Sequence, residues 1–480
     1  MFELDRDSTT PLADQIEQRL RELIASGQCP AGSRLTSIRQ FAQQLGVSPN
    51  TVVTAYDRLV AMGLIDSRGT AGFFVSERAT APFSDVMALE AGEEQEPVWL
   101  AQQANDQRAG LLQASSGTLP ASWLSDALPA AALQRALARN EAGMAARCPP
   151  QGMPELREHI AALMRQQGMA IDASRLLTTW GGTHAIDLIL RVFTQPGDVV
   201  LVENPGYFLM FGRMRQAGLR IVPITRRFDG IDLDELESAC REHRPRLLFV
   251  QSVLHNPTGW GSTAANLHKL LVIAKAQGVL IAEDDVQGHF HPGHPTRLAQ
   301  LSNLDGVIYY SSFCKALSPA LRLGYMAAEP ALLKLLLREK IYSVLTTGAL
   351  NELVLLELLS AGRWRKHLER LQGRLASART AAALQLRQTG MLLHHPGEGG
   401  LFLWGAVPAG VDVDELVKDA YLNKILLVRG ATFRADAAPD PHIRFNVAFS
   451  QHAQLASYLS ASLAAVADGH RALRKAGAAH

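Results

Sequence analysis

The chain has 480 residues, which is too long for one ordinary hydrophobic core and predicts two or three domains. Hydrophobic residues make up 47% and charged residues 19%, a composition of folded soluble proteins that excludes the disordered and fibrous classes. The net charge is +1, and the first 78 residues carry eight Arg, no Lys and nine acidic residues. A basic field over the whole protein is therefore excluded, and any DNA contact must use locally placed arginines.

Features of export and membrane insertion are missing from the sequence. The segment MFELDRDSTT is acidic and polar, without the basic flank and apolar stretch of a signal peptide. Apolar runs such as LLKLLLREK are interrupted by charges well before the roughly 20 residues that a membrane span needs. The four cysteines are scattered and form no Cys-x-x-Cys pair, which argues against a zinc site and a disulfide framework. We therefore expect a cytoplasmic protein that does not contact a membrane.

The N-terminal segment has the pattern of a small helical module. Apolar residues recur every three to four positions over residues 11–26, which predicts a first helix. Gly46 supplies the turn between a second helix and a third, which Ser48 caps and which spans residues 49–62. The stretch GLIDSRGTAGFFV predicts two short strands joined by a turn. Three helices followed by a hairpin indicate a winged helix-turn-helix domain in residues 1–78.

The rest of the chain has the pattern of an α/β protein. Residues 79–112 show weak periodicity and an acidic patch, so we expect a linker with at most one short helix. From residue 113 to 480, strand-like runs such as VVLVEN, RLLFVQS and VLIAED alternate with amphipathic stretches, which predicts a mainly parallel sheet. From about residue 364, a long helix is followed by LFLWGAV, ILLVRG and HIRFNVAF, which predicts a smaller α+β lobe.

The stretch AGSRLTSIRQFAQQLGVSPNTVVTAYDRLVAMGLI resembles the GntR family of winged helix-turn-helix regulators. In such domains the third helix enters the major groove, and its N-terminal end faces base edges and phosphates. The resemblance implies further contacts from the second helix and from the wing. The candidate DNA-binding residues are Arg34, Arg39, Ser48, Asn50, Thr51, Arg68 and Gly69.

Two of these assignments have alternatives. Many GntR proteins carry Arg just after the cap of the recognition helix, where this chain has Pro49, so its base preference should differ. Ser48 and Pro49 also read as an ordinary N-cap followed by proline in the first helical turn. Arg34 and Arg39 can equally be solvated surface charges; we favour DNA contact for Arg39 and leave Arg34 open.

Several separated segments carry parts of a pyridoxal-phosphate site. In TTWGGTHAIDLIL a Gly-rich turn leads into a helix, and the free amides of Gly182, Thr183 and His184 would hold a phosphate. In VENPGYFLM, Tyr207 resembles the aromatic residue that stacks on the pyridine ring in this fold. The alternatives are a plain connection for the first segment and a core tyrosine for the second.

Two further segments resemble the type I aminotransferases. LLFVQSVLHNPTGWG carries their Asn-Pro-Thr-Gly signature, in which Asn256 would donate to the phenolic oxygen of the ring; a tight turn is the alternative. Asp284, at the end of LIAED, would pair with the ring nitrogen, and Lys315 would form the Schiff base, although it could also be a surface lysine. Ser312 and Arg322 would then bind the phosphate.

The resemblance to type I aminotransferases extends to the small lobe, but one residue of the cofactor site differs from the usual pattern. Arg444 in HIRFNVAF resembles the arginine that binds the α-carboxylate of amino-acid substrates, with an edge-strand salt bridge as the alternative. Type I aminotransferases usually carry Tyr three residues after the ring-nitrogen Asp, where this chain has Gln287, and this difference favours sensing over turnover. The three histidines of HFHPGHP are expected in a loop and not in a metal site.

In this order, the segments resemble the MocR subfamily of GntR regulators over nearly the whole chain. The resemblance implies a transcriptional regulator that binds pyridoxal phosphate and a DNA operator and that senses an amine, amino-acid-like or vitamin ligand. It also implies a homodimer, with the two chains arranged head to tail. Two alternatives are an active aminotransferase with an accessory DNA-binding domain and a regulator that has lost its cofactor. Lys315, Asp284 and Arg322 argue against the second of these.

Overall fold

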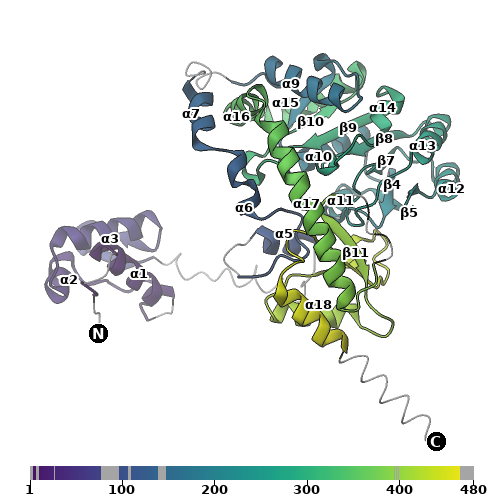
Figure 1. Cartoon of the computed structure of the whole chain (residues 1–480). Coiled ribbons are helices and arrows are strands. Elements are labelled where there is room, and N and C mark those ends of the chain that lie inside the picture. Colours follow the sequence, from purple (N-terminus) through teal and green to yellow (C-terminus); the bar gives the residue numbers. More distant parts are fainter. Residues whose placement is uncertain are drawn as a thin grey trace, which may run out of the picture. The chain divides into compact units, whose positions relative to one another are not determined.

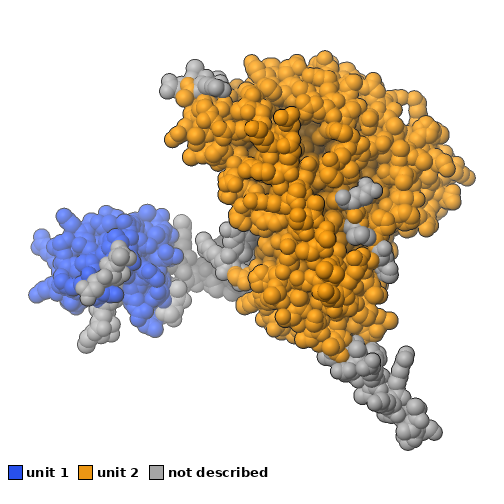
Figure 2. Space-filling model, viewed as in Figure 1, with its two compact units in different colours: residues 1–94 blue, residues 95–480 orange. Residues whose placement is uncertain are grey.

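The computed structural model divides the chain into two compact units, residues 1–94 and 95–480 (Figure 2). The boundary between them falls inside the segment 79–112, for which we expected a linker. No described helix is long and apolar enough to cross a membrane. The structure describes residues 4–6, 10–25, 28–76, 97–105, 110–138, 147–393, 395, 397 and 399–464.

The first unit has the expected three helices and a two-stranded wing. Gly46 ends the second helix with φ 61°, a left-handed conformation that lets the chain reverse before the third. Leu20, Tyr56 and Leu59 are buried in the core that the helices share with the wing. The elements are α1 (Leu12–Ala25), α2 (Ile38–Leu45), α3 (Pro49–Ala61), β1 (Ile65–Ser67) and β2 (Phe73–Val75).

The second unit is built on an eight-stranded mixed sheet of order β3-β10-β9-β8-β7-β4-β5-β6. Neighbouring strands from β9 to β5 run parallel, whereas β10 is antiparallel to both of its neighbours and β6 is antiparallel to β5. The expected mainly parallel sheet is thus confirmed. The strands are β3 (Leu176–Thr179), β4 (Val199–Asn204), β5 (Arg220–Arg227), β6 (Gly230–Ile231), β7 (Leu247–Val250), β8 (Leu280–Asp284), β9 (Val307–Ser312) and β10 (Gly324–Ala327).

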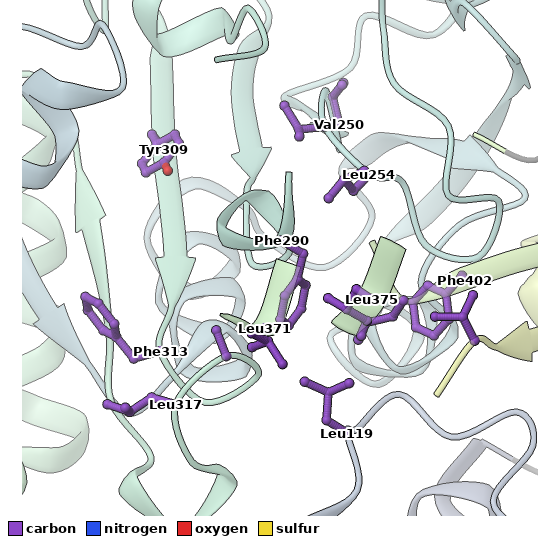
Figure 3. Packing of buried hydrophobic residues seen from close by; sticks show 14 of the residues in the cluster. Leu119, Val250, Leu254, Phe290, Tyr309, Phe313, Leu317, Leu371, Leu375 and Phe402 are labelled. Carbon is purple, nitrogen blue, oxygen red and sulfur yellow. The ribbon is translucent and has the colours of Figure 1, made fainter. Parts of the chain in front are cut away.

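Helices cover both faces of this sheet, which explains why its central strands are continuous apolar runs. Alternate side chains of β7 enter different cores: Leu248 joins one hydrophobic cluster and Phe249 the other. Figure 3 shows Tyr309 of β9 in the larger cluster together with Leu371. The helices are α9 (Pro154–Gln166), α10 (Gly182–Phe193), α11 (Phe208–Gln216), α12 (Leu233–His243), α13 (Ala264–Gln277), α14 (Leu298–Ser302), α15 (Pro330–Val344) and α16 (Ala349–Ser360).

The long helix α17 (Arg363–Gln388) connects the large sheet to a small α+β lobe, as expected (Figure 1). The lobe contains an antiparallel sheet of order β11-β13-β12, with α18 beside it. Its elements are β11 (Phe402–Ala406), α18 (Val413–Leu422), β12 (Val428–Arg429) and β13 (His442–Asn446).

The segment that precedes the large sheet in the sequence is hydrogen-bonded to the small lobe. Leu112 donates to the carbonyl of Lys424, and the amide of Asn446 donates to the carbonyl of Ala114. The helices of this segment are α5 (Pro97–Asn105), α6 (Ala121–Leu124) and α7 (Ala130–Ala138). Short 3-10 helices are η1 (Gly69–Ala71), η4 (Ser125–Ala127), η5 (Ala173–Arg175), η6 (Gly288–Phe290), η7 (Pro319–Leu321) and η8 (Gly430–Phe433).

Candidate functional site

A cavity of about 520 Å³ lies where the carboxyl ends of the parallel strands meet the small lobe. Ligands bind preferentially at this edge of open α/β sheets, and the volume is in the range of small-molecule sites. The cavity brings together nine of the ten residues that we predicted to bind cofactor or effector. They are Gly182, Thr183, Tyr207, Asn256, Asp284, Ser312, Lys315, Arg322 and Arg444.

One end of the cavity offers hydrogen-bond donors at the start of α10. Gly181 precedes this helix with φ 79°, and no side chain caps the helix, so its first amides have no side-chain acceptor. A side chain at Gly181 would be strained by this φ and tightly packed, because a Cβ there would lie 3.3 Å from both Arg322 Nη2 and Cys314 Sγ. Ser312 lines the same cavity. Backbone amides, a hydroxyl and a guanidinium form a donor set that suits a phosphate.

His184 is the exception among the predicted residues, because its side chain does not line the cavity. Its Nδ1 accepts a hydrogen bond from the Trp180 amide at 3.1 Å, and burial lowers the pKa of the imidazole to about 4. Successive helical residues are rotated by about 100°, so His184 faces the preceding turn while Gly182 and Thr183 face the cavity. The role expected for the His184 backbone amide in holding a phosphate stays a prediction.

Lys315 lies in the cavity with its amine held by a backbone carbonyl. Its Nζ donates to the Gly117 oxygen at 2.8 Å, and a Cβ at Gly117 would lie 3.4 Å from that nitrogen. Burial, together with the positive charge of Arg444, lowers the pKa of the Lys315 amine to about 8. An amine with this pKa loses its proton readily near neutral pH and becomes a nucleophile.

Asp284 is the last residue of β8 and is only 5% exposed. Its Oδ1 accepts from the Val286 amide at 2.9 Å, and no cation among the described residues forms an ion pair with it. Burial raises the pKa of this carboxyl to about 7. A cationic group that binds beside Asp284 would therefore stabilise its ionised form. Tyr207 lines the same cavity, and burial raises the pKa of its phenol to about 12, so the ring stays neutral.

Gln251 connects the parts of the site, and sequence reasoning did not identify it. Its Oε1 accepts from the Asn256 amide at 2.7 Å, and its side chain also hydrogen-bonds Asp284. Gln251 directly follows β7, so a polar residue at the carboxyl end of an apolar strand was the signal that could have indicated it. The Oδ1 of Asn256 accepts from Arg444 Nη1 at 2.8 Å, which ties the large sheet to the small lobe.

Arg444 is a buried cation without an acidic partner in the described part of the chain. It is 4% exposed; Nη2 donates to the Ser115 carbonyl at 2.6 Å, and Nε has no partner. Its guanidinium carbon lies 4.4 Å from the ring centroid of Phe402 and 4.7 Å from that of Phe433. Burial lowers the pKa of Arg444 to about 9. No described acidic residue forms the edge-strand salt bridge that was the alternative for Arg444, and an anionic ligand would supply the missing countercharge.

Gln287 also lines the cavity. It is 4% exposed, and its Oε1 has no hydrogen-bond partner among the described residues. A neutral amide at this position donates and accepts hydrogen bonds but takes no part in acid–base chemistry.

In the first unit, the three candidate arginines are exposed and form no ion pair with a described acid. The bridge between Arg34 and Phe74 and the placement of Arg68 over the Phe74 ring, at 4.6 Å, locate both at the wing. Arg39 is on α2. By contrast, Arg58 is paired with acidic residues of α1. The three candidate arginines are thus local positive charge of the kind that DNA contact would need in a protein with a net charge near zero.

The start of α3 has the cap that the sequence indicated. Ser48 Oγ accepts from the Thr51 amide at 3.2 Å, and Pro49 occupies the first turn. Ser48 and Asn50 are exposed. In the wing, Gly69 has φ 59°, a conformation that disfavours a side chain there.

Comparison with known proteins agrees with the two-part architecture. Residues 12–75 match the family of bacterial regulatory proteins of the gntR type, and residues 112–461 match aminotransferase class I and II. The Escherichia coli HTH-type transcriptional regulator YdcR is 30% identical over 449 residues, which cover 91% of this chain and 94% of YdcR. The probable rhizopine catabolism regulatory protein MocR of Rhizobium meliloti is 30% identical and covers 78% of this chain and 76% of MocR.

Among solved structures, the second unit is similar to LysN, an α-aminoadipate aminotransferase from Thermus thermophilus determined with N-(5'-phosphopyridoxyl)-L-leucine. The two share 26% identity and a TM-score of 0.71 over 81% of this chain and 99% of LysN. A kynurenine aminotransferase from Pyrococcus horikoshii has the same fold, with a TM-score of 0.67 and 21% identity over 81% of this chain and 98% of that one. The chain belongs to the MocR-type GntR regulators, in which a winged helix-turn-helix is joined to an aminotransferase class I and II domain.

Proposed function

We propose that this regulator acts in the cytoplasm, binds pyridoxal phosphate in its cavity, and senses an amine, amino-acid-like or vitamin ligand that changes its affinity for a DNA operator. The donor set fits the cofactor: Lys315 would hold it covalently, Asp284 would pair with its ring nitrogen, and Asn256 would bind its ring oxygen. Tyr207 would stack on the ring. The phosphate would be bound by Gly182, Thr183, Ser312 and Arg322. When bound, the cofactor would supply an electrophilic carbon at which a primary amine can replace the Lys315 amine, which is released.

The observation that carries this proposal is Arg444, a buried cation without an acid in the described chain, in the same cavity as Lys315. A ligand with an amine and a carboxylate can satisfy both the cofactor and the guanidinium. The Arg fork suits bidentate binding of a carboxylate. An amino acid is therefore the ligand class that the cavity favours.

The DNA module supports the second half of the proposal. The exposed Arg34, Arg39 and Arg68 are available for phosphate or base contacts, and Gly69 lets the wing approach the backbone closely. The α3 helix would present Ser48, Asn50 and Thr51 to the major groove.

Helix α5 is an element of the second unit that a bound ligand would contact. Leu100 and Ala101 of α5 line the cavity, and α5 is the first described element after residue 76. A ligand that contacts this helix would bias its position. The shift can be no larger than the difference between the ligand's affinities for the two states.

We also propose that the regulator is a homodimer, arranged head to tail. Exposed apolar side chains concentrate at the end of α15 and the start of α16, where Tyr342 is 77% exposed and Leu345 and Leu350 are both more than 40% exposed. A second copy would cover such a surface.

An active aminotransferase is the second candidate, favoured by the intact Lys315 and Asp284. Gln287 opposes it, because an amide cannot supply the acid–base function of a phenol at that position.

One experiment separates the ligand-sensing regulator from the active aminotransferase. Full-length protein loaded with pyridoxal phosphate is screened with amino acids by visible absorbance, and the ligands found are then tested for ketoacid formation and for binding to DNA enriched from a random pool. We expect altered DNA binding with slow ketoacid formation. Rapid ketoacid formation without any change in DNA binding would contradict the sensor.

A further inference from the structure

The surroundings of Arg444 are apolar on the small-lobe sheet. Arg444 of β13 is directly opposite Trp404 of β11 on one side and Val428 of β12 on the other. Residues directly opposite each other on neighbouring strands project from the same face of a sheet. A carboxylate bound by Arg444 would therefore have apolar side chains as its neighbours.

The wall continues with apolar side chains from other elements. Leu100 of α5, Phe208 of α11 and Leu426 before β12 all line the cavity and are at most 7% exposed. Together with Val428, they belong to one hydrophobic cluster. The part of the cavity beside the arginine is thus closed by aliphatic and aromatic groups from three separate segments.

Every charged residue in the described cavity wall already has a role in the proposed function. Four charged residues line it, and the proposed function uses each: Asp284, Lys315 and Arg322 for the cofactor, and Arg444 for the carboxylate. An ionised side chain on the ligand would therefore lose its water without gaining a countercharge from the described wall. Burial of such a charge is unfavourable unless it is paired.

We propose that the ligand is an α-amino acid with a single carboxylate and an uncharged, apolar side chain, and that Leu100, Leu426 and Val428 contact that side chain. This inference rests on the proposed function and deepens it, because it specifies the ligand class of the same cavity. It predicts weaker binding of acidic and basic amino acids.

The first test compares ligands on the unmodified full-length protein loaded with pyridoxal phosphate. Glycine, L-leucine, L-2-aminoadipate and L-lysine are titrated in parallel by calorimetry and by visible absorbance. We expect L-leucine to bind at least about tenfold more tightly than the other three, because its side chain buries several apolar carbons. Tightest binding of L-2-aminoadipate or L-lysine would overturn this inference and leave the amino-acid sensor intact. No response to any of the four would instead overturn the proposed function.

The second test replaces one apolar side chain of the cavity wall. Leu100→Ala should weaken L-leucine binding about tenfold and leave glycine binding unchanged, because glycine has no side chain to contact Leu100. The matched control is Val272→Ala, at an exposed position of α13, which should alter neither ligand. Leu100→Arg adds a cation to the wall and should shift the preference toward L-2-aminoadipate. Unchanged L-leucine affinity in Leu100→Ala, with glycine binding retained, would show that Leu100 does not contact the ligand.

Discussion

Replacement of Arg444 by Gln should weaken ligand binding without weakening the fold. The guanidinium has two hydrogen-bond partners, the Asn256 amide oxygen and the Ser115 carbonyl, and no acidic partner among the described residues. Removal of one partner from a buried charged contact costs about 2–5 kcal/mol of binding energy. The affinity for L-alanine should therefore fall roughly 30-fold to 5,000-fold.

The effect on stability has a different origin. Loss of the two hydrogen bonds costs about 1.5–3 kcal/mol each, because their donor is charged. Removal of an unpaired buried charge offsets this cost by an amount of the same order or larger. The free energy of unfolding of Arg444→Gln, measured without ligand, should therefore change by no more than about 1–2 kcal/mol. Arg444→Lys serves as a control, because it keeps the charge without the bidentate fork and should retain part of the affinity.

The assay compares L-alanine with ethylamine, the amine that remains when the carboxylate is removed. Absorbance titrations of the cofactor-loaded protein should show that Arg444→Gln weakens L-alanine and leaves ethylamine unchanged. Equal losses for both ligands would refute carboxylate binding by Arg444. A loss of unfolding free energy of about 3–5 kcal/mol would equally refute the reasoning, because that is the signature of a broken buried ion pair.

Four other perturbations test the remaining parts of the structure. Lys315→Ala should abolish the visible absorbance of bound pyridoxal phosphate, and a retained visible band would exclude Lys315 as the covalent attachment point. Arg39→Ala should weaken operator binding, with a smaller salt slope in a binding titration if its partner is a phosphate; an unchanged slope and affinity would remove it from the interface. Gln287→Tyr should raise the rate of ketoacid formation in single-turnover measurements, and an unchanged rate would show that Gln287 does not limit turnover. The buried ring nitrogens of His289 have no hydrogen-bond partner among the described residues, and burial lowers the pKa of the ring to about 4; the unfolded chain therefore takes up its proton near pH 6.5 while the folded chain does not. Stability should fall by up to about 3 kcal/mol between pH 6.5 and 4 from this residue; in chemical denaturation His289→Phe should lose that part of the pH dependence, and identical slopes would contradict the assignment.

The local elements of this protein follow from its sequence. Gly46, Ser48 and Pro49 specify the turn and cap of the helix-turn-helix through backbone preferences that act over a few residues. Asp284 and Lys315 could be predicted because a polar residue that follows a buried parallel strand must emerge at the edge where such strands end.

Contacts between distant segments were decided only by the tertiary structure. Gly117 and Lys315 are 198 residues apart, and Ser115 and Arg444 are 329 apart, yet both pairs are hydrogen-bonded in the cavity. Periodicity reports which face of an element is apolar, but it does not report which other element covers that face. For this reason the sequence could not predict that Leu100 of α5 lines the cavity.

The same reasoning applies to the side chains of His184 and Arg444. The orientation of His184 depends on one helical rotation of about 100°, which a Gly-rich motif does not specify. Whether Arg444 pairs with an acid depends on every residue that packs around it, and the fold surrounds it with aromatic rings and carbonyl oxygens. Sequence patterns determined the elements and the residues that carry the chemistry, and tertiary packing decided the neighbours that leave a buried cation open to a ligand.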